Sequence, residues 1–292
     1  MKEYIAFDIG GTQIKYGIVS ETGTVLKHKT VLTEIHLGGE QIIQKLILLS
    51  KQLMNEHTIS GIGISTAGIV NIHKGIVTGG VEHIRNYATI PIIDRLQEVL
   101  QVPVSVENDV NCAAFGEKWN GSVREKENFI MLTIGTGVGG AIFIDGELYR
   151  GHSFSAGEWG NMLIEGKTFE EVASISGLIR LVRKYKGKGE WNGRTIFELY
   201  DKGDREVAQA VGIFFKHLAI GISNLAYIFN PETIIIGGGI TDRGNEFLKE
   251  VKEEVSKYLN QEIYNNCEIE LAQNGNCAGM IGAIYHLLHH HK

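Results

Sequence analysis

The chain has 292 residues, of which 43% are hydrophobic and 21% charged, enough for one large domain or two modest ones. Its net charge of -6 provides no basic surface for nucleic acid or an anionic membrane, so we expect a soluble protein that acts on small molecules. The first residues lack the apolar core of a secretory signal, and we identify no apolar run of membrane-spanning length, which indicates a cytoplasmic protein.

The first predicted element is a hairpin over residues 4–19, "YIAFDIGGTQIKYGIV". Its turn and flanks carry an acid, two glycines, a hydroxyl and an ammonium: Asp8, Gly10, Gly11, Thr12 and Lys15. Two adjacent glycines remove the Cβ atoms that would keep a ligand away from the backbone, so N–H groups can converge on an anion. The turn therefore predicts a phosphate site.

The next segments alternate between helical and strand patterns. Apolar spacing predicts a helix over 38–57, strands over 60–65 and 102–107, and a helix over 109–119. Asn108 and Asp109 stand at the start of that last helix, where either could serve as its N-cap. Two consecutive capping-type residues exceed what one helix start needs, so a chemical role for this pair competes with the structural one.

Residues 129–145, "FIMLTIGTGVGGAIFID", repeat the first hairpin loosely, with Gly135, Thr136 and Gly137 in the turn. Two such hairpins imply two similar lobes that face one ligand from opposite sides. A third glycine cluster, residues 237–239, follows the apolar strand of 233–236.

The remaining elements complete an α/β pattern. A helix over 205–229 stops at Asn230-Pro231, and a charged helix over 245–260, a strand near 268–272 and a Gly/Ala helix from about Ala278 follow. We predict an N-terminal lobe over 1–118 and a C-terminal lobe over 119–292. The last helix, about 277–292, packs back toward the first lobe.

The cysteines and the terminal histidines carry no predicted function. Three scattered cysteines indicate reduced core or near-core thiols rather than a disulfide framework: Cys112, Cys267 and Cys277. Four histidines near the C-terminus are expected in a solvated tail: His286, His289, His290 and His291.

Five motifs in this order, "DIGGT", "VENDVNCAAFGE", "TIGTGVGGAIF", "AGEWGNM" and "IIIGGGI", resemble the ROK family of sugar kinases and related repressors. The resemblance covers essentially the whole chain. It implies two ribonuclease-H-like lobes of the actin-like ATPase superfamily, with a nucleotide and sugar cleft between them. The implied activity is transfer of the γ-phosphate of ATP, with Mg²⁺, to a primary (6-) hydroxyl of a hexose-type sugar.

The resemblance also assigns residues. Asp109 would accept the proton of the attacking hydroxyl, and Asp8 would lie near Mg²⁺, through water. Residues implied to bind ATP are Gly10, Gly11, Thr12, Lys15, Gly135, Thr136, Gly137, Gly238 and Gly239. Residues implied to bind the sugar are Gly68, Asn86, Asn108, Glu158, Asn161 and Glu170, with Glu171 as the alternative to Glu170.

The segment "FSAGEWGNMLIEG" (154–166) departs from the family pattern. Asn161 occupies the position of a histidine that binds structural zinc together with a cysteine cluster, and residues 162–180 contain neither Cys nor His. A zinc site without most of its ligands has no reason to persist, so we predict no structural zinc. The chain resembles most the zinc-free β-glucoside kinases, which act on sugars such as cellobiose, and N-acylmannosamine kinases are the second expectation, ahead of glucokinases.

Two other classes compete with a kinase. A sugar-responsive repressor of this family carries a DNA-reading domain before the hairpin, whereas here Asp8 is eight residues from the start. A catalytically inactive sugar-binding or sugar-sensing protein would keep the motifs without turnover, but the intact Asn108-Asp109 pair favours an enzyme. A homodimer is expected by resemblance alone.

Overall fold

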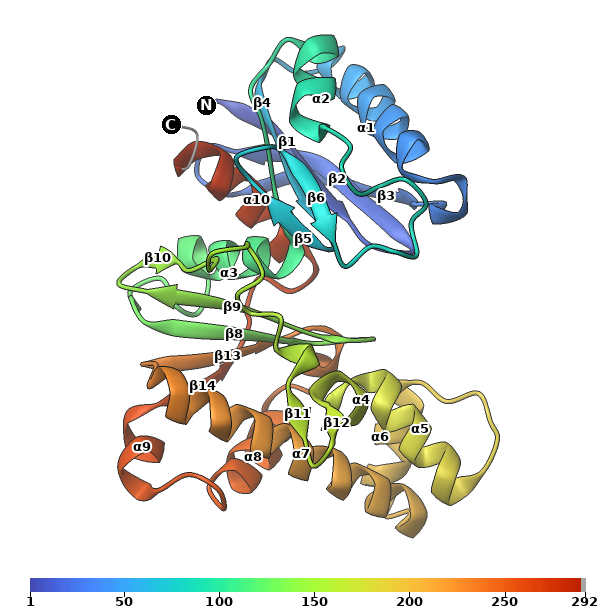
Figure 1. Cartoon of the computed structure of the whole chain (residues 1–292), viewed down its shortest axis with the longest axis vertical. Helices are drawn as coiled ribbons and strands as arrows, with labels where there is room; N and C mark the ends of the chain where they lie inside the picture. Colours follow the sequence, from blue (N-terminus) through green and yellow to red (C-terminus); the bar gives the residue numbers. More distant parts are fainter. Residues whose placement is uncertain (290–292) are drawn as a thin grey trace. The chain divides into compact units, whose positions relative to one another are not determined.

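The computed structural model describes residues 1–289 and has the expected α/β architecture (Figure 1). The chain divides into two compact units. Unit 1 comprises Met1–Glu125, Gly151–Ser155 and the described residues from Gln273 on, and unit 2 comprises Lys126–Arg150 and Ala156–Ala272. The sequence places the division after residue 118, whereas the chain leaves unit 1 after Glu125 and returns to it twice.

Unit 1 is built on a five-stranded sheet in which β2 is antiparallel to β1, and β1, β4 and β7 run parallel. In sheet order the strands are β3 (Val25–Leu32), β2 (Gln13–Ser20), β1 (Glu3–Ile9), β4 (Ile59–Thr66) and β7 (Val104–Asn108). A separate hairpin pairs β5 (Ile69–Asn71) with β6 (Ile76–Gly79). The helices are η1 (Ile35–Leu37), α1 (Gly39–Met54), α2 (Ile92–Leu100), α3 (Asp109–Asn120), η4 (Gly275–Cys277) and α10 (Ala278–His289).

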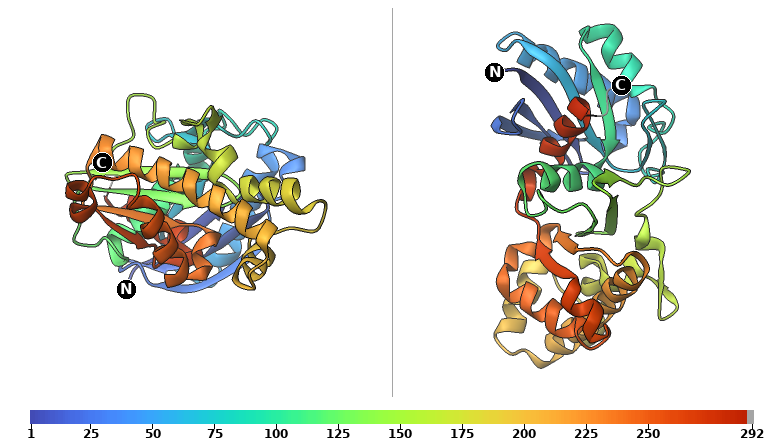
Figure 2. Two further views of the ribbon diagram at one scale, coloured as in Figure 1. Left: turned by 90° about the horizontal axis from the view of Figure 1, so that it is seen from below. Right: turned by 90° about the vertical axis from the view of Figure 1, so that its left-hand side faces the viewer.

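The side chains of β1 alternate between the two faces of this sheet and are buried on both. Ile5 and Phe7 belong to one buried cluster with α1 and α2, while Tyr4 and Ala6 pack with Met280 of α10 on the other face. Figure 2 shows α10 beside α3 and against the strands. Both faces are therefore closed by helices, which fixes the ends of the parallel strands.

Glycine permits α10 to approach α3 closely. A Cβ on Gly282 would lie 1.6 Å from the carbonyl oxygen of Cys112. The helix also carries His286, which is only 5% exposed, so the expected solvated tail is wrong for this residue because the helix continues through it. His290 and His291 lie outside the described residues.

Unit 2 repeats the topology of unit 1, as the two similar hairpins predict. Its sheet has the order β10-β9-β8-β13-β14, again with three parallel strands followed outward by antiparallel ones. The strands are β8 (Phe129–Ile134), β9 (Val138–Ile144), β10 (Glu147–Leu148), β13 (Thr233–Gly237) and β14 (Glu268–Leu271), with a small hairpin of β11 (Leu163–Ile164) and β12 (Lys167–Thr168). The helices are η2 (Trp159–Asn161), α4 (Phe169–Ala173), α5 (Ile175–Lys186), α6 (Gly193–Asp201), α7 (Arg205–Phe229), η3 (Gly239–Arg243), α8 (Asn245–Val255) and α9 (Gln261–Asn266).

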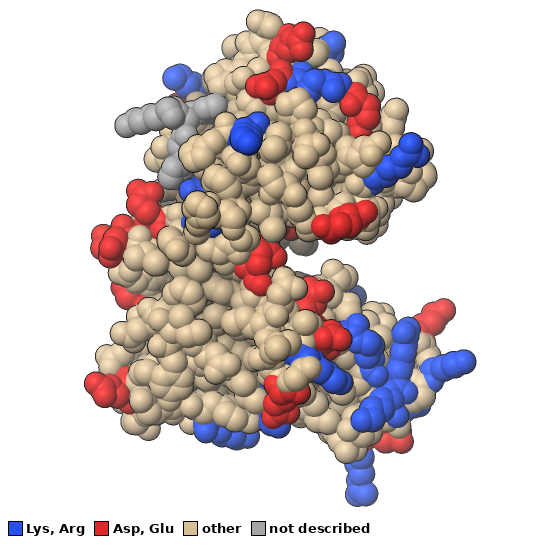
Figure 3. Space-filling model, viewed as in Figure 1, with Lys and Arg blue, Asp and Glu red and all other residues tan. Residues whose placement is uncertain are grey.

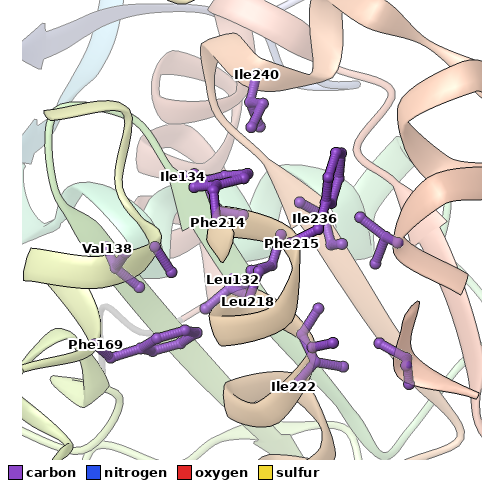
Figure 4. Close-up of a cluster of buried hydrophobic side chains, with 14 of the residues drawn as sticks. Leu132, Ile134, Val138, Phe169, Phe214, Phe215, Leu218, Ile222, Ile236 and Ile240 are labelled. Carbon is purple, nitrogen blue, oxygen red and sulfur yellow. The ribbon is translucent and has the colours of Figure 1, made fainter. Parts of the chain in front are cut away.

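The core of unit 2 lies between this sheet and α7. Figure 4 shows side chains of β8, β13 and α7 that meet there, such as Leu132, Ile236 and Phe214. By length and composition α7 does reach membrane-spanning size, with a mean hydropathy of 1.4 over its most apolar window, which corrects the expectation drawn from the sequence. That window is 56% buried inside the unit, so packing against the sheet accounts for its apolar character.

Although the net charge is negative, positive side chains are concentrated in a region of the surface of unit 2. Lys and Arg side chains gather around the end of α5 (Figure 3), where Arg183, Lys184 and Lys186 occupy the last turn. Positive side chains there complement the partial negative charge of the helix C-terminus. Lys186 also pairs with Asp204 and Glu206, so part of this charge is neutralised locally.

Candidate active site

Polar side chains of unit 1 meet where the parallel strands β1, β4 and β7 end. Asp8 lies beside Ser65 in the ladder of β1 and β4, and Ser65 lies beside Glu107 in the ladder of β4 and β7. Carboxyl ends of parallel strands are the usual location of ligand sites in α/β folds. The register therefore brings chemistry-bearing residues from distant parts of the sequence to one edge.

Asp8 is held by two donors. Lys15, its cross-strand partner, lies 3.2 Å away through Nζ and Oδ2, and the Ser65 hydroxyl donates to Oδ1 at 2.9 Å. Lys15 thus neutralises the acid at the head of the hairpin.

The surroundings of Asp8 fit magnesium. Mg²⁺ prefers oxygen ligands, keeps several waters and takes only one or two carboxylates beside substrate phosphates. The Asp8 side chain is 18% exposed at the strand edge, so its carboxylate can serve as such a ligand. Within residues 1–289, no group of three or more His, Cys, Asp or Glu side chains is arranged to hold a metal ion by itself.

Asn108 takes the capping role that the sequence left open between it and Asp109. Asn108 is the N-cap of α3: its Oδ1 accepts from the N–H groups of Val110 and Asn111 at 2.9 and 3.0 Å. Its Nδ2 donates to the Gly68 carbonyl and to Asp109 Oδ1, both at 3.0 Å. Asp109 is therefore oriented in the first turn of α3, where the helix dipole favours the ionised carboxylate.

Glu107, to which the sequence analysis assigned no role, holds Asn108 in place through hydrogen bonds. Its side chain is 1% exposed, and Oε1 accepts from the Asn108 N–H at 2.7 Å and from the Asn111 amide at 3.0 Å. A buried carboxylate with such donors fixes the transition from β7 into α3. Its position directly before Asn108 was the only signal in the sequence.

The turn between β1 and β2 is exposed and built for close approach. Thr33 secures it by donating from its hydroxyl to the Gly10 carbonyl at 2.6 Å and from its N–H to the Thr12 carbonyl at 2.9 Å. A Cβ on Gly11 would meet no atom within 4 Å, and Gly11 has no positive φ. The fold itself does not require glycine at this position, so an approaching ligand is the better explanation.

Gly68 and Asn86, by contrast, are explained by the backbone alone. Gly68 has φ +95°, and a Cβ there would lie 2.6 Å from the Gly79 carbonyl oxygen. Asn86 is exposed with φ +54°, a conformation that Asn tolerates. Their residue types are accordingly weak signals of sugar binding, although the Gly68 carbonyl contacts Asn108.

In unit 2, the second glycine turn joins β8 to β9 and is contacted by Glu170. The carboxylate of Glu170 accepts from the Val138 N–H at 3.2 Å, and a Cβ on Gly137 would lie 2.3 Å from its Oε2. Glu171 is instead part of the capping box of α4, where it accepts from the N–H and hydroxyl of Thr168, each at 2.9 Å. The structure therefore favours Glu170 over Glu171 as a site residue.

The segment around Glu158 is anchored by its neighbour. Trp159 is buried and donates from its indole N–H to the Gly139 carbonyl at 3.2 Å. Glu158 and Asn161 remain exposed on either side of it. Although the Glu158 side chain reaches the surface, surrounding atoms desolvate its carboxyl group, and this desolvation, followed by the negative charge of Glu170, raises the pKa of Glu158.

A cavity of about 400 Å³ opens beside the third glycine cluster. Gly239, where a Cβ would meet nothing within 4 Å, lines it, whereas Gly238 is needed by the fold because its φ is +92°. The other lining residues are Ile175, Gly193, Arg194, Phe197, Glu198, Asp201, Ile240, Asp242 and Arg243. This size and mixture of apolar walls with a few charged groups suits a small organic ligand.

One wall of this cavity is rigid. The Arg243 guanidinium lies 4.3 Å from the centre of the Phe197 ring and pairs with Asp201 and Glu250, each at 2.7 Å. Sequence reasoning found the glycines but missed α6 and Arg243. The sole signal was the amphipathic spacing of residues 193–201, which had no motif to draw attention to it.

Comparisons with known proteins agree with this geometry. A family model described as "ROK family" matches residues 4–290. A beta-glucoside kinase of Listeria monocytogenes is 37% identical over 295 residues, which cover 97% of this chain and 96% of that protein. These matches span nearly the whole of both chains.

Two solved structures extend the similarity to the fold. Lmo2764 from Listeria monocytogenes, proposed to be an N-acetylmannosamine kinase, has a TM-score of 0.89 at 34% identity, over 99% of this chain and 100% of that one. A ROK family glucokinase from Streptomyces griseus, in complex with glucose and AMPPNP, has a TM-score of 0.83 at 27% identity, over 96% and 97%. The expected fold class is confirmed.

Proposed function

The chain belongs to the ROK family and is an ATP-dependent carbohydrate kinase, and from this premise we propose that it phosphorylates the 6-hydroxyl of β-glucosides. The relative named as a beta-glucoside kinase supports this substrate class. Asn161 supports it as well, because an exposed amide replaces the zinc-bound histidine expected from the family resemblance. An inactive sugar-binding protein is set aside, since several relatives that match over nearly the whole chain are named as kinases.

The orientation of Asp109 is the observation that carries the chemistry. In the proposed step the sugar O6–H gives its proton to the Asp109 carboxylate as O6 forms a bond to the γ-phosphorus. The bond from that phosphorus to the bridging oxygen breaks, and ADP leaves with the electron pair. Asn108 holds the base by its amide, and the N-terminus of α3 keeps it ionised.

We assign the nucleotide to the glycine segments. Gly10, Gly11 and Thr12, with Lys15 beside them, bind phosphate in unit 1. Phosphate is bound in unit 2 by Gly135, Thr136 and Gly137, and adenosine occupies the cavity next to Gly238 and Gly239. Asp8 would hold Mg²⁺ through water, and the bound ion would neutralise charge on the transferred phosphate.

The sugar-binding residues are proposed as Gly68, Asn86, Asn108, Glu158, Asn161 and Glu170. Since both hydrogens of the Asn108 amide are donated within unit 1, this residue acts mainly by positioning Asp109 and the Gly68 carbonyl. Glu158 and Glu170 offer acceptor oxygens for sugar hydroxyls. A cytoplasmic homodimer without structural zinc completes the proposal.

N-acetylmannosamine is the second candidate substrate, because Lmo2764 is 34% identical over the whole chain. Glucose comes third. A direct comparison of ADP release with cellobiose, gentiobiose, N-acetylmannosamine and glucose, each with Mg-ATP, distinguishes these substrates. The proposal expects the largest kcat/KM for a β-glucoside, and NMR of the product should place the phosphate on O6.

The Asp109→Asn variant tests the catalytic base. We expect kcat to fall about 10²- to 10⁴-fold with little change in the KM for ATP or for the sugar, since the amide keeps the shape of the side chain but cannot accept the proton. Asp94→Asn is the matched control, because Asp94 is an exposed acid in the first turn of α2. A full rate in Asp109→Asn would exclude this residue as the base, and phosphorylation of N-acetylmannosamine alone would overturn the substrate class.

A further inference from the structure

An aromatic pair lies at the tip of the hairpin that leads away from the catalytic edge of unit 1, with one ring from the hairpin and the other from a distant segment. The ring centres of His73, in the β5–β6 turn, and Phe154, in the returning segment 151–155, are 5.5 Å apart at an angle of 72°. His73 is exposed and Phe154 is half-buried. The mechanism described above uses neither residue.

The hairpin connects this pair to the base. Its first strand starts directly after Gly68, whose carbonyl accepts from the Asn108 amide that also holds Asp109. At about 3.3 Å per residue, the strand carries the chain roughly 10 Å from Gly68 to Asn71. Asn71 then fixes the tip, because its Oδ1 accepts from the N–H groups of His73 and Lys74 at 3.1 Å.

Phe154 is held in an uncommon backbone conformation. Its φ is +63°, which a bulky residue other than glycine adopts rarely and at a cost in free energy. Such strain persists where the surroundings demand it and is frequent at ligand sites. Ser153 and Ser155 flank Phe154 in the sequence, and their hydroxyls lie 2.8 Å apart, within hydrogen-bonding distance of each other.

We propose that His73 and Phe154 form a subsite for the second ring of a β-linked disaccharide whose first ring is phosphorylated; this rests on the proposed function. Aromatic rings bind the C–H face of a pyranose, while neighbouring hydroxyls bind its polar edge. The length of the β5 strand matches the length of a β-linked disaccharide, so a sugar that starts at Gly68 can reach the hairpin tip with its second ring. The subsite selects two-ring over one-ring acceptors without contact to the reacting hydroxyl.

The test compares His73→Ala and Phe154→Gly with the unaltered protein on three acceptors: glucose, methyl β-glucoside and cellobiose. Glycine suits φ +63°, so Phe154→Gly removes the ring without adding backbone strain. We expect kcat/KM for cellobiose to fall about tenfold, mainly through KM, with glucose and methyl β-glucoside unchanged within about twofold. Tyr149→Ala, which removes a 51% exposed aromatic in unit 2, is the control and should leave all three unchanged.

The outcomes separate this inference from the proposed function. If the unaltered protein phosphorylates none of the acceptors, the proposed function fails. A second outcome is that the unaltered protein phosphorylates both glucose and cellobiose while both variants lower kcat/KM equally for all three acceptors. In that case the aromatic pair only holds segment 151–155 in place, and the subsite is disproved. A loss confined to cellobiose supports the subsite.

Discussion

At the scale of single residues, the glycines of this chain fall into two kinds. Gly238 is required by the fold, since its φ is +92° and a Cβ would lie 2.3 Å from the Ile134 carbonyl oxygen. Gly11 and Gly135 have no positive φ and no neighbour within 4 Å of a Cβ. Sequence alone cannot distinguish these kinds, because both read as tight turns.

This difference leads to a prediction for Gly11→Ala and Gly135→Ala. Stability should change by less than about 0.5 kcal/mol, because the added methyl meets open space. The KM for ATP should rise at least about tenfold, or 1.4 kcal/mol, because the methyl holds phosphate away from the backbone. Thermal unfolding and steady-state kinetics on each variant measure both effects.

Two other glycines serve as controls. Gly212→Ala places a methyl in equally open space on α7, away from both hairpins, and should leave the KM for ATP unchanged. Gly140→Ala should instead lower the free energy of unfolding by about 1–3 kcal/mol, because its Cβ would lie 1.8 Å from the Trp159 ring. An unchanged KM in both hairpin variants would show that the turns do not bind phosphate.

The site residues could be predicted only as far as their types are informative. The position of Asp109 at a helix start was readable, and so was the acid next to two glycines in the first hairpin. The choice between Glu170 and Glu171 was not, since it depends on a capping box with Thr168 that leaves one of them for the site. Partners brought together by sheet register, such as Ser65 with Asp8, also cannot be read from sequence spacing.

At the scale of elements, strong periodicity gave reliable predictions. The helix predicted over 205–229 is α7, Arg205–Phe229, because its start and its Asn-Pro stop are both marked. The helix predicted over 245–260 ends earlier, at Val255, and is followed by the separate helix α9. Residues 169–201 had no element assigned, since α4 to α6 are short and are bounded by caps rather than by long apolar patterns.

The end of α3 depends on a buried acid, Glu117, to which the sequence analysis assigned no role. Glu117 is 0% exposed, and its carboxylate accepts from the N–H and hydroxyl of Ser122 at 2.9 and 3.1 Å. It also accepts from the N–H groups of Gln273 and Asn274 at 2.9 and 2.7 Å. One side chain thereby ties α3 to the segment that precedes α10.

Glu117→Ala should lower the free energy of unfolding by about 3 kcal/mol, because the N–H groups of Gln273 and Asn274 lose a buried acceptor. Denaturant unfolding measures this change, and hydrogen exchange at Gln273 and Asn274 should accelerate. Glu125→Gln, at a side chain 91% exposed, is the control and should change stability by no more than about 0.5 kcal/mol. Unchanged exchange at both amides in Glu117→Ala would contradict the role of this carboxylate.

At the scale of the whole molecule, the chain path was only partly readable. The repeated hairpins predict two similar units, and the two sheets do share one topology. The return of Gly151–Ser155 to unit 1 could not be foreseen, since five residues without periodicity carry no signal of their destination. The return from Gln273 on was predicted for the last helix, from about residue 277, but not for the residues that lead into it.

The segment that precedes α4 shows what can take the place of a metal. Trp159 packs against Gly140, β11 pairs with β12, and the capping box of Thr168 and Glu171 starts the next helix. A structural zinc site requires four Cys or His ligands held in a tetrahedron. Because apolar packing and hydrogen bonds hold this segment, we expect it to be ordered without a zinc ion.

We therefore predict that the purified protein contains substoichiometric zinc by elemental analysis and that EDTA leaves its thermal unfolding temperature unchanged. Loss of a structural zinc would instead unfold the segment, because the free energy of metal binding is part of the free energy of folding. Kinase activity should disappear in EDTA and return with Mg²⁺ alone, since magnesium is needed with the nucleotide and not for the fold. One zinc per chain, or a lower unfolding temperature in EDTA that zinc restores, would contradict this reading of residues 157–171.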